Sequence, residues 1–188
     1  MSESKFRTSE SHPLRIDWVQ PKGAWGKIGM SFCPGKIQEY ARTGAWQRNL
    51  HLDVRAIKES GAQMVVSLIE LREFAELHVA TLPAVVWSVG LEWIHLPIVD
   101  MCAPNSTWED LWQSLGAQIV DMLSRGQPIF IHCKGGLGRT GTVAACLLIE
   151  SGMCPGDAIK AVRAARRGTI ETRDQEAFVR AYKPRWRD

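Results

Sequence analysis

Several features that would define other classes of protein are missing from this sequence. No uninterrupted apolar run approaches the roughly 18 residues that a membrane-spanning helix needs. Residues 1–11 are polar and lack the apolar centre of a signal peptide, so we expect a flexible tail there. The net charge of +3 is too small to indicate nucleic-acid binding. We therefore expect neither a membrane span nor a nucleic-acid partner.

Cysteines are few and irregularly spaced. Their odd number argues against a disulfide framework, and no Cys-x2-Cys pair suggests a zinc site. We expect free thiols in a reducing compartment, the cytoplasm. The five are Cys33, Cys102, Cys133, Cys146 and Cys154.

The composition that remains is that of a globular protein. Hydrophobic residues make up 45% of the chain and charged residues 23%. The length of 188 residues fits one domain, which we place at residues 12–183, and there is no internal repeat. We expect this domain to be a monomer.

Strand-like and helix-like patterns alternate along most of the chain, which predicts an α/β fold with a largely parallel central sheet flanked by helices. The expected strands are Leu14–Val19, Lys27–Phe32, Gln63–Ile69, Leu91–Ile98 and Ile129–Ile131. The expected helices are Trp46–Ser60 with Asn49 as a possible N-cap, Glu70–His78, Leu82–Val89, Trp108–Arg125, Thr140–Ser151, Pro155–Arg167 and Thr172–Tyr182.

The stretch from Pro128 to Thr142 carries the strongest functional signal. A short apolar strand is followed by a loop with three glycines and then by the start of an apolar helix. This arrangement directs backbone N–H groups and the positive end of a helix dipole toward one point, which suits a phosphate-sized anion. The loop amides of Lys134–Arg139 are therefore candidates for phosphate binding. They belong to Lys134, Gly135, Gly136, Leu137, Gly138 and Arg139.

Two side chains of this loop add chemistry to the anion site. Cys133 lies at the base of the loop, where amide donors and the helix dipole favour its thiolate, the form that acts as a nucleophile. Arg139 can hold two phosphoryl oxygens with its planar guanidinium group. The pattern His-Cys-x5-Arg resembles the signature of cysteine-dependent protein phosphatases. A buried cysteine in an ordinary glycine-rich turn, or a dinucleotide fingerprint, would explain the same glycines less well.

Attack by a cysteine on a phosphoester requires an acid that protonates the leaving group. Asp100 lies 33 residues before Cys133, on a loop that follows the preceding strand. The alternative is that Asp100 only forms a turn. Asp110 and Asp121 are poorer candidates, because both fall on the helix after this loop.

The segment from Val65 to Val179 resembles the dual-specificity branch of these phosphatases, with the kinase-associated, cyclin-dependent-kinase-inhibitor-type family nearest. The resemblance rests on the signature loop, on His95-Leu96-Pro97-Ile98-Val99-Asp100 and on Gly168-Thr169-Ile170-Glu171-Thr172, and it weakens before residue 60. It implies a protein-tyrosine-phosphatase-like fold and Asp100 as the general acid.

Three further roles follow from the loop and from this resemblance. The hydroxyl of Thr140 is expected to hydrogen bond to the Cys133 sulfur. His132 is expected to point away from the phosphate, because side chains alternate along a strand, and to support the loop by hydrogen bonds. Gln175 is a candidate for positioning water, with a solvated helix residue as the alternative.

The sequence therefore predicts a phosphomonoester hydrolase that works through a cysteinyl-phosphate intermediate, without a metal ion or organic cofactor. The expected substrates are phosphotyrosine proteins, with phosphoserine and phosphothreonine left open. A phosphoinositide or small-molecule phosphatase is an alternative, since Lys134 lies in the loop but Leu137 replaces the second lysine typical of inositide enzymes. A phospho-binding adaptor and a rhodanese-type sulfurtransferase are weaker alternatives. Cys102 could form a reversible disulfide with Cys133.

Overall fold

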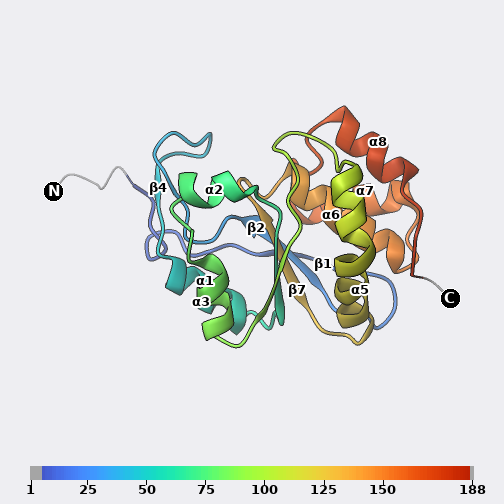
Figure 1. Cartoon of the computed structure of the whole chain (residues 1–188), viewed down its shortest axis with the longest axis horizontal. Helices are drawn as coiled ribbons and strands as arrows, with labels where there is room; N and C mark the ends of the chain where they lie inside the picture. Colours follow the sequence, from blue (N-terminus) through green and yellow to red (C-terminus); the bar gives the residue numbers. More distant parts are fainter. Residues whose placement is uncertain (1–5, 187–188) are drawn as a thin grey trace.

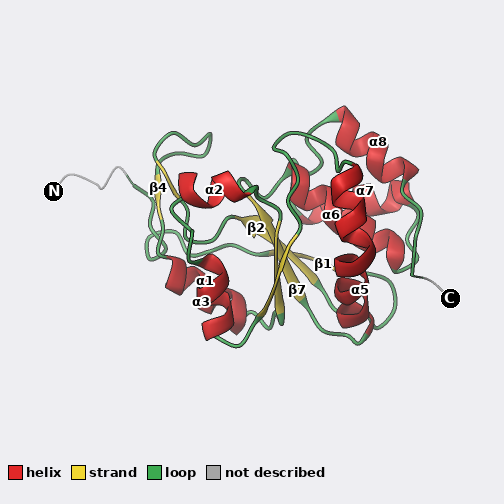
Figure 2. Ribbon diagram, viewed as in Figure 1, coloured by secondary structure: helices red, strands yellow, loops and turns green. Residues whose placement is uncertain are grey.

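A five-stranded sheet forms the centre of the protein in the computed structural model, which describes residues 6–186 (Figures 1 and 2). Its strand order is β1-β2-β7-β5-β6, and only the edge strand β1 is antiparallel to its neighbour. The predicted, largely parallel sheet is therefore confirmed, with β7 at its centre. The strands are β1 (Asp17–Val19), β2 (Ile28–Phe32), β5 (Met64–Ser67), β6 (Glu92–His95) and β7 (Ile129–Cys133).

Helices cover both faces of this sheet, on opposite sides in Figure 1. One layer contains α1 (Leu50–Glu59), α2 (Leu71–Glu76) and α3 (Leu82–Ser88). The other contains α4 (Ser106–Leu111), α5 (Ala117–Ser124), α6 (Gly138–Glu150), α7 (Pro155–Ala165) and α8 (Arg173–Ala181). Helix α6 packs against β7 and β2, and α7 and α8 pack in turn against α6.

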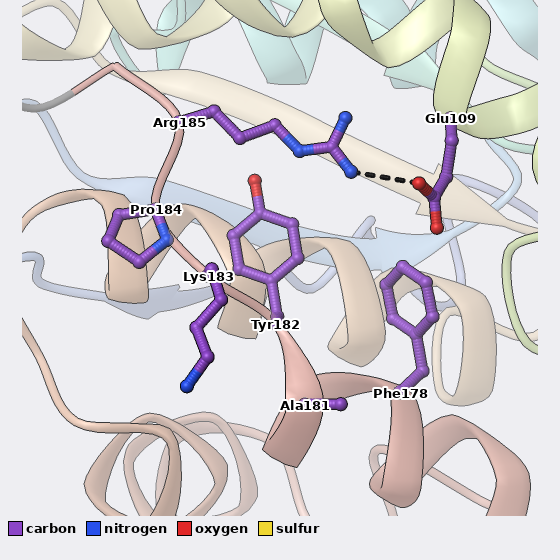
Figure 3. Close-up of a pocket in the computed structure, with 7 residues that line it drawn as sticks. All are labelled: Glu109, Phe178, Ala181, Tyr182, Lys183, Pro184 and Arg185. Carbon is purple, nitrogen blue, oxygen red and sulfur yellow. Dashed lines mark hydrogen bonds and ion pairs between the residues drawn. The ribbon is translucent and has the colours of Figure 1, made fainter.

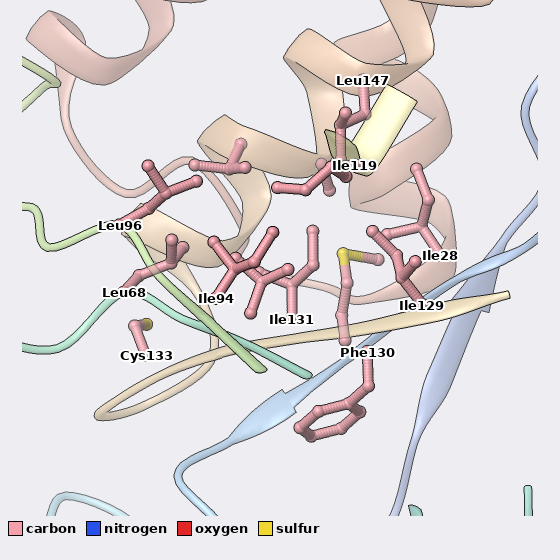
Figure 4. Packing of buried hydrophobic residues seen from close by; sticks show 14 of the residues in the cluster. Ile28, Leu68, Ile94, Leu96, Ile119, Ile129, Phe130, Ile131, Cys133 and Leu147 are labelled. Carbon is pink, nitrogen blue, oxygen red and sulfur yellow. The ribbon is translucent and has the colours of Figure 1, made fainter. Parts of the chain in front are cut away.

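The central strand β7 is buried on both faces, which explains its uninterrupted apolar sequence. Ile129 and Ile131 point toward Leu147 of α6, whereas Phe130 points to the opposite face (Figure 4). These side chains belong to one hydrophobic cluster that joins the sheet to both helix layers. The packing fixes β7, and with it the place where the chain leaves the sheet after Cys133.

Two expected helices differ from the structure. Trp46 and Gln47 form strand β4 (Trp46–Gln47), which pairs with β3 (Ile37–Gln38), so the helix begins only at Leu50 after its predicted N-cap Asn49. The helix expected at Trp108–Arg125 starts at Ser106 and contains a π-helical segment, η1 (Trp112–Gly116), between α4 and α5. There Trp112 lies fully buried and stacks on Trp108 at a centroid distance of 4.7 Å.

The start of the chain is more ordered than expected. Within the segment predicted to be a flexible tail, Arg7 forms a parallel bridge with Trp46, and its backbone N–H donates to Ala45 O at 2.9 Å. Ser9 is buried, and its hydroxyl accepts the backbone N–H of Asn49. These contacts join Arg7 and Ser9 to the segment around Trp46 and Asn49, and residues 1–5 of the predicted tail lie outside the described part. Across residues 6–186, no helix is long and apolar enough to cross a membrane.

Candidate active site

The signature loop connects the end of β7 to the start of α6, at the carboxyl edge of the sheet. Cys133 is the last residue of β7, and α6 begins at Gly138. The Cys133 thiol is buried, and its sulfur accepts a hydrogen bond from the backbone N–H of Gly136 at 3.2 Å. The predicted strand, loop and helix N-terminus are present, with at least one loop amide directed at the sulfur.

One of the three loop glycines is required by the backbone. Gly136 has φ +71°, and a Cβ at this position would lie 2.2 Å from Ser31 O at the end of β2. Gly135 has open space around it, so the loop shape does not demand a glycine there. At Gly138 a Cβ would lie 2.8 Å from both Gln175 Nε2 and Glu171 Oε2. The loop is therefore packed between β2 and the start of α8.

Arg139 is almost fully buried and held on several sides. Its Nη1 and Nη2 atoms donate to Glu73 Oε2 and Oε1 at 2.6 and 3.0 Å, and Nη1 also donates to Ile98 O at 3.1 Å. Burial opposes its charge, but the hydrogen bonds that it donates to Glu73 and the neighbouring negative groups raise the pKa of Arg139. Its Nε has no hydrogen-bond partner among the described residues. A fixed guanidinium group with one free buried donor is well suited to bind an oxyanion.

Glu73 was not found by sequence reasoning, although it holds this arginine. It lies in the first turn of α2 and forms a capping box with Glu70, whose backbone N–H donates to Glu73 Oε2 at 2.8 Å. Burial opposes its ionisation, yet the hydrogen bonds from Arg139 and the backbone lower the pKa of Glu73. The available signal was a glutamate three residues after a helix start that follows a buried strand.

The structure brings Asp100 to the same arginine. Asp100 lies on the loop after β6, and its Oδ1 atom is 2.8 Å from Arg139 Nη2. The same oxygen accepts the backbone N–H of Met101, a residue with the left-handed φ of 61°. About half of the Asp100 side chain is exposed, at 47%. The expected acid is therefore next to the loop and also accessible to solvent.

His132 and Thr140 differ in how well they match their expected contacts. His132 is fully buried, and its Nε2 lies 2.7 Å from the hydroxyl of Ser67 on β5. Burial lowers the pKa of His132 to about 3. Thr140 is also buried, but its hydroxyl has no partner within the described part of the chain, so the expected bond to Cys133 is not present. Gly136 N–H supplies the hydrogen bond to this sulfur instead.

Gln175 is fully buried, so it is not a solvated helix residue, and its side chain bonds to two segments of the chain. Its Oε1 accepts the backbone N–H groups of Glu171 and Thr172 at 2.9 and 3.2 Å, which completes the N-terminal capping box of α8. Its Nε2 donates to Cys102 O at 3.1 Å. Gln175 thus ties α8 to the loop that carries Asp100.

Two further residues that sequence reasoning missed support the signature loop. Arg166 donates from Nε to Gly136 O at 2.7 Å, and its Nη1 pairs with Asp17 of β1. Glu171 Oε2 accepts the backbone N–H of Gly138 at 2.8 Å. Both contacts join the loop backbone to residues far away in the sequence. No local sequence pattern indicates such contacts.

Of the other cysteines, Cys33 lies beside the signature loop, because its backbone N–H donates to Lys134 O at 3.4 Å. All five cysteines are free thiols; Cys102 is exposed, and Cys33 is buried. Within residues 6–186, no three histidine, cysteine or acidic side chains are grouped so that they could hold a metal ion. Among the predicted catalytic residues, Asp100 and Arg139 are in direct contact, and Arg139 lies at the other end of the loop that begins after Cys133.

Two hollows lie outside the loop itself. One, of about 440 Å³, is next to the Asp100 loop and is lined by Glu70, Leu71, Arg72, Pro97, Val99, Asn105 and Thr107. The other, of about 350 Å³, contains none of the predicted site residues and lies under the C-terminal segment (Figure 3). It is lined by Glu109, Phe178, Ala181, Tyr182, Lys183, Pro184 and Arg185, and the ion pair between Glu109 and Arg185 crosses it.

Comparison with known proteins shows that the sequence of this chain is similar to those of phosphatases. The model of the family "Polymorphic toxin system, DSP-PTPase phosphatase" matches residues 38–153. Rat cyclin-dependent kinase inhibitor 3 is 28% identical over 190 residues, which cover 97% of this chain and 84% of the rat protein. Human protein tyrosine phosphatase type IVA 3 is 34% identical over 99 residues, or 52% of this chain and 56% of the human protein.

A solved structure shows the same architecture. The crystal structure of kinase associated phosphatase, with its catalytic-site cysteine replaced by serine, superimposes with a TM-score of 0.77 at 26% sequence identity. The match covers 89% of this chain and 92% of that chain. The expected protein-tyrosine-phosphatase-like fold is therefore confirmed.

Proposed function

The chain belongs to the DSP-PTPase phosphatase family and is a cysteine-dependent protein phosphatase of the tyrosine and dual-specificity type; we propose that Cys133 is its nucleophile, Arg139 its phosphate clamp and Asp100 its general acid. The loop amides of Lys134–Arg139 are proposed to bind the phosphoryl oxygens, although in this structure the N–H of Gly136 donates to the Cys133 sulfur and that of Gly138 to Glu171. These assignments rest mainly on how the Arg139 side chain is held in the structure. Its guanidinium group is buried and fixed by Glu73, while its Nε donor is left without a partner in the described structure.

In the first step, the Cys133 thiolate attacks the phosphorus atom of the substrate. The bond from phosphorus to the ester oxygen breaks, and the electron pair goes to that oxygen, which takes a proton from Asp100. Arg139 and the loop N–H groups stabilise the negative charge on the three phosphoryl oxygens. A cysteinyl-phosphate and a free hydroxyl compound result.

In the second step, water attacks the same phosphorus atom. Asp100, now ionised, takes a proton from this water, and the sulfur–phosphorus bond breaks to release inorganic phosphate and the thiolate. Thr140 lies next to Arg139 and carries a buried hydroxyl without a partner among the described residues. We assign this hydroxyl to the leaving sulfur. His132, through Ser67, holds the end of β7, and Gln175 holds the acid loop.

Phosphorylated protein side chains are the substrate class that we favour. The hollow beside Asp100 is lined by the apolar side chains of Leu71, Pro97 and Val99, and it offers room for polypeptide next to the phosphorylated residue. A small-molecule phosphate ester would leave this surface unused. We place the protein in the cytoplasm, because all five of its cysteines are free thiols, and we propose that it acts as a monomer.

The test is the hydrolysis of p-nitrophenyl phosphate against pH in the presence of EDTA. Wild type is expected to be active, and Cys133→Ser inactive. Asp100→Ala is expected to lose most of the rate, because the leaving group then lacks its proton donor. Activity that survives in Cys133→Ser would contradict the assignment of the nucleophile.

The substrate class needs a second comparison under the same conditions. Phosphotyrosine, phosphoserine and phosphothreonine peptides are compared with a soluble phosphoinositide by release of inorganic phosphate. The proposal expects kcat/KM for the phosphotyrosine peptide to exceed that for the inositide. The opposite order would favour the lipid phosphatase, and binding of peptides without turnover would favour an adaptor.

A further inference from the structure

Lys36 is a buried lysine beside the signature loop. It follows the turn after β2, and its side chain is almost completely shielded from solvent, with the residue 3% exposed. Its ammonium group lies 3.5 Å from Lys134 O, the carbonyl of the residue after Cys133. On its other sides it faces the rings of Phe32 and Trp46, at 4.7 and 5.5 Å from their centroids. This lysine therefore approaches the loop from the side of β2 and β4.

This ammonium group has no carboxylate partner within 4 Å among the described residues. The buried carboxylate of Asp53 is bound by Arg48 instead, which donates to its two oxygens at 2.7 and 2.8 Å. Asp53 Oδ2 also accepts the N–H of Gly35. A buried unpaired cation is costly, and contact with aromatic rings offsets only part of that cost. Lys36 is thus a positive charge kept inside the protein without an ion pair.

The groups that act electrostatically on Lys36 include two thiols and two positive charges. Burial lowers the pKa of Lys36 to about 8, the thiolate forms of Cys33 and Cys133 act in the opposite direction, and the positive charges of Arg48 and Lys134 lower it further. Burial also raises the pKa of Cys33, so that this thiol stays neutral. Cys133, the proposed nucleophile, is the other thiol that acts on Lys36, and it precedes the residue whose carbonyl Lys36 contacts.

We propose that Lys36 is a positioning residue for the nucleophile, whose buried ammonium group, held beside the carbonyl of Lys134, stabilises the Cys133 thiolate. Lys36 does not touch the substrate; it acts through Cys133. The inference rests on the proposed role of Cys133 and extends it, because it names a charge outside the signature loop on which that thiolate depends. An opposite charge at close range shifts ionisation by roughly one to three pH units.

The experiment measures the ionisation of Cys133 directly, without relying on turnover. Iodoacetamide alkylation of the Cys133 peptide is followed by mass spectrometry as a function of pH, in wild type, Lys36→Met and Lys36→Gln. Both variants are expected to move the pH midpoint of alkylation upward by about one unit or more. Lys36→Met keeps the volume of the side chain, and replacing an unpaired buried charge by an apolar group often preserves or increases stability.

Lys58→Met is the matched control. Lys58 also donates its ammonium group to a backbone carbonyl, Gly90 O at 3.2 Å, but it lies at the end of α1 and is accessible to solvent. Its removal is expected to leave the midpoint unchanged. An unchanged midpoint in folded Lys36→Met and Lys36→Gln would overturn the proposal. Failure of both variants to fold would also overturn it, since Lys36 would then be a structural residue.

The outcome is separable from that of the proposed catalytic roles. If wild type hydrolyses no phosphoester but the midpoint shifts in the Lys36 variants, the coupling of Lys36 to the thiolate stands and the catalytic assignment fails. If wild type is active and the midpoint does not shift, the catalytic assignment stands and the role of Lys36 fails.

Discussion

The carboxylate of Asp100 lies 2.8 Å from the Nη2 atom of Arg139, so the proposed acid and the proposed clamp form an ion pair with each other. A phosphoryl oxygen would need the same donor. On the proposed roles, substrate binding is expected to displace Asp100 from the guanidinium group, which frees its carboxyl group for proton transfer. The ion pair links substrate binding to the placement of the acid.

Removal of the Asp100 carboxylate should accordingly have two opposite effects. In Asp100→Ala, kcat is expected to fall by about 10²- to 10⁴-fold, because the leaving group loses its proton donor. Inhibition by inorganic phosphate is expected to become stronger, because no carboxylate competes for Arg139. Asp110→Ala, which changes an exposed acid on α4, serves as the control and should alter neither quantity. Weaker phosphate inhibition in Asp100→Ala would contradict this account.

The contact between Glu73 and Arg139 predicts a large effect on stability. Both side chains are buried, with 3% and 1% of their surface exposed. Glu73→Ala leaves the guanidinium group buried without its main partner, so the free energy of unfolding should fall by about 3–5 kcal/mol. Urea denaturation measures this change. Glu76→Ala, on the same helix but half exposed, should change stability little; equal losses in both variants would refute the argument.

The buried His132 predicts how stability depends on pH. Burial lowers the pKa of His132 from 6.5 to about 3, so between these values the unfolded chain binds a proton that the folded protein does not. The unfolding free energy should therefore fall as the pH drops below 6.5, by up to about 1.4 kcal/mol per pH unit. Denaturation of wild type and His132→Asn from pH 7 to pH 4 tests this, with His51→Asn as an exposed control. An equally steep decline in His132→Asn would show that other groups cause it.

The C-terminal segment depends on a buried hydrogen-bond network around Glu150. Its Oε1 accepts the Tyr182 hydroxyl at 2.6 Å, and the same hydroxyl accepts Trp112 Nε1–H at 2.7 Å. Tyr182→Phe leaves a carboxylate oxygen and an indole N–H with one partner fewer, at a cost of about 1–3 kcal/mol. Tyr40→Phe removes the same atom from an exposed side chain and should be neutral in the same denaturation experiment. A neutral Tyr182→Phe would mean that water replaces the hydroxyl.

The arrangement of Cys133 and Asp100 could be predicted because each follows a strand of a parallel sheet. The carboxyl ends of such strands meet at one edge, and the spacing of the signature loop identified the chemistry. Glu73 and Arg166 could not be predicted in the same way. Their roles arise from how α2 and α7 pack against the loop, and the sequence near each residue gives no sign of the partner.

The errors in the expected elements have different causes. Trp46 lies just before a helix and was included in it, but its pairing with the β3 strand and with Arg7 takes precedence over local pattern. The bond expected from the Thr140 hydroxyl to the Cys133 sulfur is not formed in this structure, where the Gly136 N–H donates to that sulfur; the proposed role of Thr140 is confined to the leaving sulfur in the second step. At Trp46 contacts with distant residues decide the geometry, whereas at Cys133 the conformation of the loop backbone does.

The central claim is that phosphate passes through Cys133, and trapping of the intermediate tests it most directly. Wild-type protein is mixed with p-nitrophenyl phosphate, quenched rapidly in acid, digested and analysed by mass spectrometry. The account predicts a phosphorylated Cys133 peptide, with more of it in an Asp100→Ala sample, where hydrolysis of the intermediate lacks its base. Phosphate on another residue, or steady turnover with no phosphorylated Cys133 in either sample, would contradict it.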